Sequence, residues 1–176
     1  MFLDYDRTLF DTDKFYEWIG ENRVLRLTQL TSREIPPPDF SQFLYDDTVT
    51  FLQRVRGTHT LILLTYTINI VLQEMKMQGS GILEYFDEVI MVSGENEGLS
   101  GKGTAAREFL MRVNEPGWEH VFIDDSPHNI DEVKRMNPEI SCVRIDRVTH
   151  AQGMLHGELL TPDHIIRNLN ELGGVF

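Results

Sequence analysis

The stretch Met1-Phe2-Leu3-Asp4-Tyr5-Asp6-Arg7-Thr8-Leu9-Phe10 decides the fold of this chain. It predicts a short apolar strand that ends at Asp4, with Asp6 in the turn beyond it. Two carboxylates this close to a buried strand are costly unless a cation holds them. One carboxylate could attack a substrate while the other handles protons, with a metal ion offsetting the charge. A plain polar turn is the alternative that this segment alone leaves open.

Length and composition describe a chain of 176 residues, which fits one domain with a small insertion. Hydrophobic residues make up 41%, enough to bury a core. The formal net charge of -12 argues against nonspecific binding to nucleic acid or anionic membranes, because both need basic patches. No apolar run approaches the roughly 20 residues of a membrane span, and Asp4 and Asp6 interrupt any signal peptide. We therefore expect a soluble, cytoplasmic protein.

The only cysteine, Cys142, lies in the apolar run Ile140-Ser141-Cys142-Val143. An intramolecular disulfide is therefore impossible. An apolar setting favours a buried core thiol over a catalytic one.

Four further apolar runs predict strands, at 60–64, 88–92, 120–123 and 140–145. They lack polar alternation, which is typical of a parallel sheet covered on both faces. Helical patterns lie between and after them, at 49–55, 68–77 (ending at Gly79), 104–113, 127–136 and 161–172. The alternation predicts a doubly wound, Rossmann-like α/β fold with right-handed crossovers. Only three residues precede Asp4, so either the first strand is very short or the natural chain begins further upstream.

One stretch breaks the alternation of strands and helices. Residues 15–30 have a helical pattern, and Pro36-Pro37-Pro38 then forms a stiff linker, because three prolines cannot continue a helix. We interpret 13–45 as a small helical cap inserted into a core formed by 1–12 and 46–176.

Polar side chains follow the predicted strands where ligands bind in an open α/β sheet, beyond the carboxyl ends. Each has an ordinary explanation by itself: a threonine can end a strand, an acidic pair can begin a helix, and a lysine can be a surface residue. Their joint occurrence in this order predicts a site. The residues are Asp4, Asp6, Thr8, Thr65, Tyr66, Lys102, Asp124, Asp125 and Asn129.

This set resembles the haloacid dehalogenase superfamily, in its phosphatase type, and its motifs run through nearly the whole chain. The first motif, Asp-x-Asp-x-Thr, matches 4–8, and the fourth, an acidic pair after an apolar strand, matches 121–125. Both are specific. The second, a strand ending in Thr or Ser, matches Thr65, and the third, a lysine before a helix, matches Lys102; both are weak alone. Arg7 stands where many members carry glycine and could shape the pocket.

The resemblance implies a nucleophile, an acid and a metal. Asp4 would attack phosphorus and form an aspartyl phosphate, while Asp6 would protonate the leaving oxygen and then activate water. Mg²⁺ would bind the Asp4 carboxylate, the Asp6 backbone carbonyl and Asp125, with or without Asp124; an all-oxygen site suits this ion. Dehalogenase members lack an acid at the position of Asp6 and need no metal, so Asp6 favours a phosphatase.

The remaining residues would hold the substrate or support the loops. Thr65 and Lys102 would hold the phosphoryl oxygens, and Lys102 would also offset the charge of Asp4. Thr8 would brace its loop, and Asn129 would tie the loop of the acidic pair from outside the metal site.

Other functions stay open on the sequence. A phosphomutase or phosphotransferase would use the same residues, although mutases usually have a fuller cap. A receiver-like signalling module fits the motif order poorly, and a silent phospho-ligand-binding module would not need every catalytic position filled. The substrate, a phosphorylated small molecule or a phosphoprotein, is not determined, and neither is the oligomeric state. Candidate substrate contacts are Arg7, Tyr66, Arg23 and Arg26; the last two share a face of the cap helix and could equally be solvated.

Overall fold

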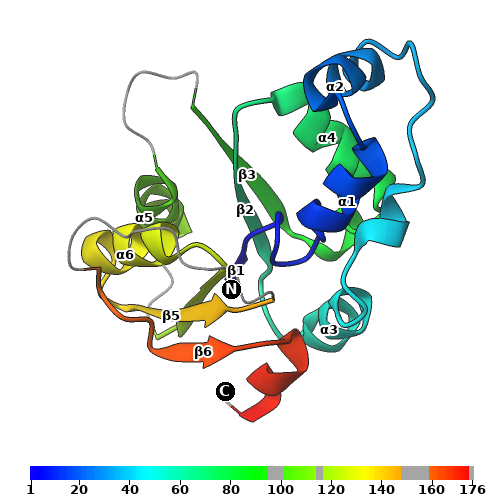
Figure 1. Cartoon of the computed structure of the whole chain (residues 1–176). Helices are drawn as coiled ribbons and strands as arrows, with labels where there is room; N and C mark the ends of the chain where they lie inside the picture. Colours follow the sequence, from blue (N-terminus) through cyan, green and yellow to red (C-terminus); the bar gives the residue numbers. More distant parts are fainter. Residues whose placement is uncertain (95–100, 114–116, 148–158, 175–176) are drawn as a thin grey trace.

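A six-stranded parallel sheet forms the centre of the protein, in the strand order β3-β2-β1-β4-β5-β6 (Figure 1). The structure is a computed structural model, and it describes residues 1–94, 101–113, 117–147 and 159–174. The predicted doubly wound α/β fold is confirmed. The strands are β1 (Phe2–Leu3), β2 (Ile62–Thr67), β3 (Glu88–Ser93), β4 (His120–Asp124), β5 (Ile140–Ile145) and β6 (His164–Ile166).

Helices alternate with these strands, and the helix predicted at 127–136 has the bounds of α6. Its first residue is Pro127, and the Ser126 side chain caps it by accepting a hydrogen bond from the Asn129 backbone N–H at 3.4 Å. None of the described helices is long and apolar enough to cross a bilayer. The α-helices are α1 (Thr12–Ile19), α2 (Arg23–Thr31), α3 (Thr48–Val55), α4 (Ile70–Gly79), α5 (Lys102–Val113) and α6 (Pro127–Met136), and the 3-10 helices are η1 (Phe40–Phe43), η2 (Leu83–Tyr85) and η3 (Leu169–Gly174).

Helices cover both faces of the sheet, which is why its strands are apolar without alternation. Neighbouring residues of one strand belong to opposite cores: Ile62 packs with α5 and α6, whereas Leu63 packs with α1, α3 and α4. On β4, Phe122 belongs to the core on the α5 and α6 side, and Ile123 belongs to the core on the other side. Figure 1 shows α5 and α6 on one side of the sheet and α1 to α4 on the other.

Strand β1 is short but central. Phe2 and Leu3 pair with Ile62 and Leu63 on one side and with Phe122 and Ile123 on the other. The chain then continues toward the carboxyl edge, where the Asp4 backbone N–H donates to the Ile123 carbonyl at 3.0 Å. The sheet therefore places Asp4 in the middle of the edge where ligands bind in this architecture.

The C-terminal segment corrects the sequence prediction. Instead of the helix predicted over 161–172, β6 pairs in parallel with β5, and η3 follows it. Asp163 fixes this arrangement, because its backbone N–H donates to the Cys142 carbonyl and its carboxylate accepts from the Cys142 N–H, both at 2.8 Å. The open edge of β5 thus overrides a local helical pattern.

The inserted segment is helical but not a single helix over 15–30. It breaks between α1 and α2 at Gly20, whose φ of 72° is a conformation that few other residues adopt. The Gly20 N–H donates to the Tyr16 carbonyl at 3.1 Å and closes α1. The domain boundaries stay a prediction, although tilted and edge-to-face contacts between the rings of Phe10, Phe15 and Phe43 join α1 and η1 to the core.

Gly79 is the last residue of α4, as predicted, but the reason is packing rather than a left-handed conformation. A Cβ added there would lie 2.4 Å from the Phe40 ring. Only glycine therefore lets α4 and η1 approach this closely.

Cys142 is fully buried in β5, as predicted, and burial together with the charge of Asp163 raises the pKa of its thiol to about 12. We expect the native protein to react with an aromatic disulfide reagent at pH 8 at least about 100-fold more slowly than the urea-unfolded chain, because the thiolate is disfavoured and shielded. Absorbance of the released thiol measures both rates. Equal rates would place Cys142 at an accessible surface.

Candidate active site

The carboxyl edge of the sheet gathers the catalytic candidates from four elements. Asp4 follows β1, Asp124 ends β4 and is followed by Asp125, and Lys102 is the first residue of α5. Thr65 lies within β2 rather than at its end, since that strand continues to Thr67. Its side chain is nevertheless fully buried near the others, where it accepts a hydrogen bond within the site.

Lys102 bridges two carboxylates in the interior. Its side chain is 2% exposed, and its Nζ donates to Asp4 Oδ1 and, at 2.7 Å, to Asp124 Oδ2. Burial alone would lower the pKa of Lys102, but the charges of Asp124 and Asp4 outweigh it and raise that pKa. The ammonium group therefore stays charged and anchors the centre of the site.

Asp4, Asp124 and Asp125 form a group that could hold a metal ion, with one oxygen from each lying within 4.8 Å of the others. Burial raises the pKa of Asp4 well above its usual value, even beside Lys102. Burial and the charge of Asp124 raise the pKa of Asp125 to about 7. Three carboxyl groups thus share one ammonium group, and when all three are ionised they carry more negative charge than Lys102 neutralises. Oxygen donors with surplus negative charge fit a hard divalent cation such as Mg²⁺.

Two of the predicted supporting residues contact these carboxylates directly. Thr8 Oγ1 donates to Asp4 Oδ2 at 3.3 Å. Asn129 Nδ2 donates to Asp124 Oδ1 and Oδ2 at 3.1 and 3.0 Å, and the Ser126 N–H donates to Asp124 Oδ1 at 2.8 Å. With Lys102, these donors fix the orientation of Asp124.

The Asp6 carboxylate points to a different set of partners. Its Oδ1 accepts from Thr12 Oγ1 at 2.6 Å and from Lys76 Nζ at 2.5 Å, and its Oδ2 accepts from Gln73 Nε2 at 2.9 Å. Burial acts to raise the pKa of Asp6, but the Lys76 charge and these hydrogen bonds outweigh it and lower the pKa. The predicted metal contact of Asp6 concerned its backbone carbonyl, and it stays a prediction.

Sequence reasoning missed Gln73 and Lys76, because these two polar residues of α4 are buried beside the apolar Leu72 and Met77. Gln73 is 2% exposed and Lys76 5%, whereas Val71 is 51% exposed. The one available signal was their spacing of three residues on the helix predicted at 68–77, which puts both on one face. The usual assumption that polar residues face solvent hid their role.

Arg147, just beyond β5, was also missed. Its Nε and Nη2 donate to the Thr8 carbonyl at 3.1 and 2.8 Å, and its Nη1 donates to Asp47 at 2.7 Å. The guanidinium lies 4.3 Å from the centre of the Tyr45 ring. Arg147 therefore joins the turn that follows Asp4 to Asp47, the residue that precedes α3.

Arg7 adopts a φ of 58°, in the left-handed region. This conformation explains why many members of the resembling family carry glycine at this position. The Arg7 guanidinium donates to Asp13 at 3.0 Å, so it links the turn after Asp4 to the start of α1.

The other predicted substrate contacts are Arg23, Arg26 and Tyr66. Arg23 and Arg26 stack on aromatic rings of α1, at 5.2 and 5.8 Å from the centres of Tyr16 and Trp18. Tyr66 is 48% exposed on β2. Contact of these side chains with a substrate stays a prediction.

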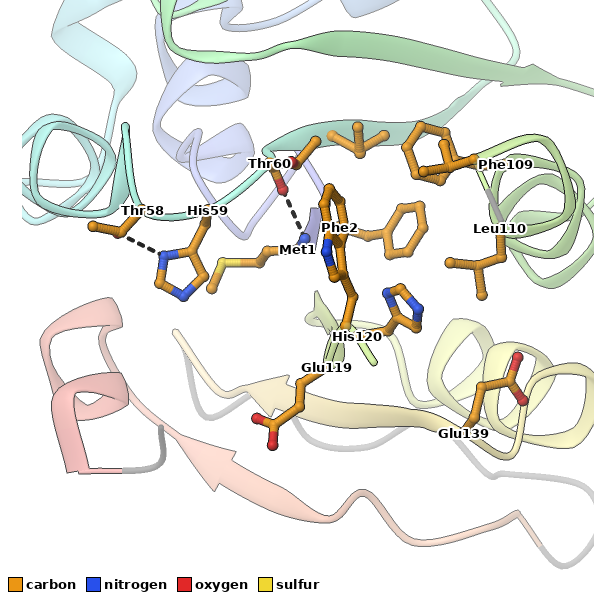
Figure 2. Close-up of a pocket in the computed structure, with 13 residues that line it drawn as sticks. Met1, Phe2, Thr58, His59, Thr60, Phe109, Leu110, Glu119, His120 and Glu139 are labelled. Atoms are coloured by element: carbon orange, nitrogen blue, oxygen red, sulfur yellow. Dashed lines mark hydrogen bonds between the residues drawn. The ribbon is translucent and has the colours of Figure 1, made fainter. Parts of the chain in front are cut away.

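A cavity of about 490 Å³ lies at the opposite, amino-terminal end of the strands. Figure 2 shows Phe2, Phe109 and His120 around it, with the Met1 amino group donating to the Thr60 carbonyl at 2.8 Å. None of the predicted catalytic residues lines this cavity. This cavity and the carboxylate site are therefore separate features.

Comparison with known proteins shows a likeness to solved structures. No protein-family model and no curated protein matches the chain. Solved structures do match, and for three of them the match covers 99% of this chain and 96% of the matched chain. They include a haloacid dehalogenase-like family hydrolase from Streptococcus pneumoniae (18% identity, TM-score 0.69), the magnesium-bound HAD-hydrolase YfnB from Bacillus subtilis (14%, 0.66) and an L-2-haloacid dehalogenase from Xanthobacter autotrophicus (13%, 0.64).

The chain has the haloacid dehalogenase-like fold. At such low identities the likeness concerns the fold alone. The matched structures include both a dehalogenase and a magnesium-bound protein, so the haloacid dehalogenase-like fold does not choose between their chemistries. The residues of the site must decide.

Proposed function

We propose that this protein is a Mg²⁺-dependent hydrolase of phosphate monoesters that works through an aspartyl-phosphate intermediate. The observation that carries the proposal is the second carboxylate, Asp6, placed two residues after Asp4 and held inside the site by Lys76. A dehalogenase needs no acid there, whereas phosphoryl transfer to and from Asp4 needs one proton donor and one proton acceptor.

In the first step, a carboxylate oxygen of Asp4 attacks the phosphorus atom. The bond between phosphorus and the ester oxygen breaks, and the leaving oxygen takes its proton from Asp6. Lys102 and Thr65 would hold the phosphoryl oxygens during this transfer; Lys102 contacts Asp4 directly, and the Thr65 hydroxyl is linked to Asp6 through Gln73. The products are the free alcohol and a phosphorylated Asp4.

In the second step, Asp6, now a carboxylate, accepts a proton from a water molecule that attacks phosphorus. The bond between phosphorus and the Asp4 oxygen breaks, which releases phosphate and restores Asp4. The lowered pKa of Asp6 favours the carboxylate form that this step requires and disfavours the protonated form that the first step requires.

Mg²⁺, when bound, supplies positive charge that offsets the negative charge of the phosphoryl group. Asp4, Asp125 and Asp124 would hold it, in agreement with their spacing and surplus negative charge. Asp124 contributes mainly by orienting Lys102, because three neighbouring groups already occupy its oxygens.

The substrate of the proposed reaction is a phosphorylated small molecule or a phosphoprotein. We place the protein in the cytoplasm, where both occur together with Mg²⁺.

The experiment that tests this function is hydrolysis of a panel of phosphate esters and 2-haloacids with Mg²⁺, with EDTA, and with Mg²⁺ restored after EDTA. We expect catalytic turnover of p-nitrophenyl phosphate that EDTA abolishes and Mg²⁺ restores, because the carboxylate group needs its cation. Released phosphate and halide are measured separately.

The other outcomes separate the alternatives. EDTA-insensitive release of halide would indicate a dehalogenase. A single phosphorylation without turnover would indicate a receiver-like module. A folded protein that binds phosphate without turnover would be a silent phospho-ligand-binding module. Transfer of phosphate to a second hydroxyl, rather than to water, would indicate a phosphomutase or phosphotransferase.

A further inference from the structure

We propose that Lys76 and Gln73 of α4 are positioning residues: they fix the Asp6 carboxylate for proton transfer, and Gln73 also connects it to the phosphate-binding hydroxyl of Thr65. This inference rests on the proposed phosphatase function. It adds a part of the site that belongs to neither the acidic group nor the four motifs described above.

The geometry of the contacts leaves Asp6 little freedom. Lys76 Nζ lies 2.5 Å from Oδ1, and Gln73 Nε2 lies 2.9 Å from Oδ2, so α4 binds both oxygens of one carboxylate. Thr12, at the start of α1, is the third donor to this carboxylate, and its hydroxyl lies 2.6 Å from Oδ1. A carboxylate held at both oxygens by donors from two helices has its rotamer fixed.

The contact between Lys76 and Asp6 determines which face of α4 is buried. Its ammonium lies over the rings of Tyr5 and Phe10, 5.3 and 5.2 Å from their centres, in the aromatic core. A buried cation is costly unless it is paired, and the described ion-pair partner of Lys76 is Asp6. The Lys76 ammonium is therefore a buried charge that lies where it can orient Asp6, the proposed acid.

Gln73 has a second contact that separates its role from that of Lys76. The same Nε2 that donates to Asp6 also donates to Thr65 Oγ1 at 3.0 Å. Loss of Lys76 would disturb Asp6 alone. Loss of Gln73 would disturb both Asp6 and the hydroxyl proposed to hold the phosphoryl oxygens, so the two residues should differ in their effects on kcat and KM.

The test compares Lys76→Met and Gln73→Leu with Met77→Ala, a matched control on the same helix that removes a buried side chain away from Asp6. With Mg²⁺, we expect Lys76→Met to lower kcat about 10- to 100-fold at nearly constant KM. The loss should be larger for phenyl phosphate than for p-nitrophenyl phosphate, whose leaving group needs no proton. Gln73→Leu should lower kcat and also raise KM several-fold, while Met77→Ala should change stability but not the ratio between the two substrates.

A double-mutant cycle on the residual p-nitrophenyl phosphatase activity shows whether Lys76 acts through Asp6. In an Asp6→Asn background, Lys76→Met should have no further effect on kcat. Additive effects of the two substitutions, or a folded Lys76→Met with wild-type kcat and substrate ratio, would overturn the positioning role while leaving the phosphatase function intact. If Lys76→Met does not fold, Lys76→Gln takes its place in the same comparison.

A crystal structure of the same variant tests the inference independently of activity. We expect Asp6 to leave its contacts with Gln73 and Thr12 when Lys76 is replaced. An unchanged Asp6 side chain would contradict the inference. A wild-type protein without activity on any ester would instead contradict the proposed function, and the crystal structure would still decide the positioning role.

Discussion

Asp4→Asn is expected to abolish turnover of phosphate esters, with a loss of about 10³-fold or more. The amide keeps the shape of the side chain but removes the charge and nucleophilicity that attack on phosphorus requires. Steady-state phosphate release measures the loss. Rapid acid quench with a radiolabelled ester measures the covalent intermediate, which should be absent from Asp4→Asn.

The control for this variant is its folded state. Asp4 is buried and its pKa is already raised, so a neutral side chain is well tolerated there, and Lys102 keeps its contact with Asp124. The unfolding transition should remain cooperative. An Asp4→Asn protein that hydrolyses esters at the wild-type rate would show that another group is the nucleophile.

Lys102→Met is expected to lower the free energy of unfolding by about 3 to 5 kcal/mol at pH 8, because it leaves two buried carboxylates without their cation. Asp4 and Asp124 are 4% and 0% exposed, so water cannot replace the ammonium group. The loss should shrink at pH 5, because burial raises the pKa of Asp4 and protonation of that carboxyl then removes unpaired charge. Urea unfolding at the two pH values measures the difference.

The matched control is Lys134→Met, which breaks an ion pair with Asp163 at 2.6 Å where the two side chains are 23% and 37% exposed. Its cost should be below about 1 kcal/mol, since solvent screens such pairs. Adding Asp124→Asn to Lys102→Met should restore part of the stability but no activity. A Lys102→Met protein as stable as Lys134→Met would contradict the buried bridge.

The sequence was sufficient for strands β1 to β5 of the sheet and for the acidic residues that follow β1 and β4. Apolar runs and their capping signals are local, so the order of strands and helices could be read from residues such as Pro127 and Ser126. Because parallel strands share one carboxyl edge, the placement of Asp4 beside Asp124 followed from that order. The resemblance to the haloacid dehalogenase superfamily also implied that Lys102 would lie near Asp4.

The errors arose where distant residues outweighed local preference. The segment predicted as a helix over 161–172 forms β6, because an open edge of β5 offers backbone partners that no local pattern reveals. The predicted cap helix breaks at Gly20, where one residue of positive φ decides the direction of the chain.

By itself, the sequence determined the α/β class, the alternation of strands and helices that brings the motif residues to one edge, and the identity of the charged groups there. Only the tertiary structure decided which way α4 faces. Its polar residues Gln73 and Lys76 turn inward because Asp6 supplies a buried partner, and its apolar Val71 is left at the surface. Local composition cannot encode this choice, since the free energy of burying a charge depends on a partner that lies 70 residues away in the chain.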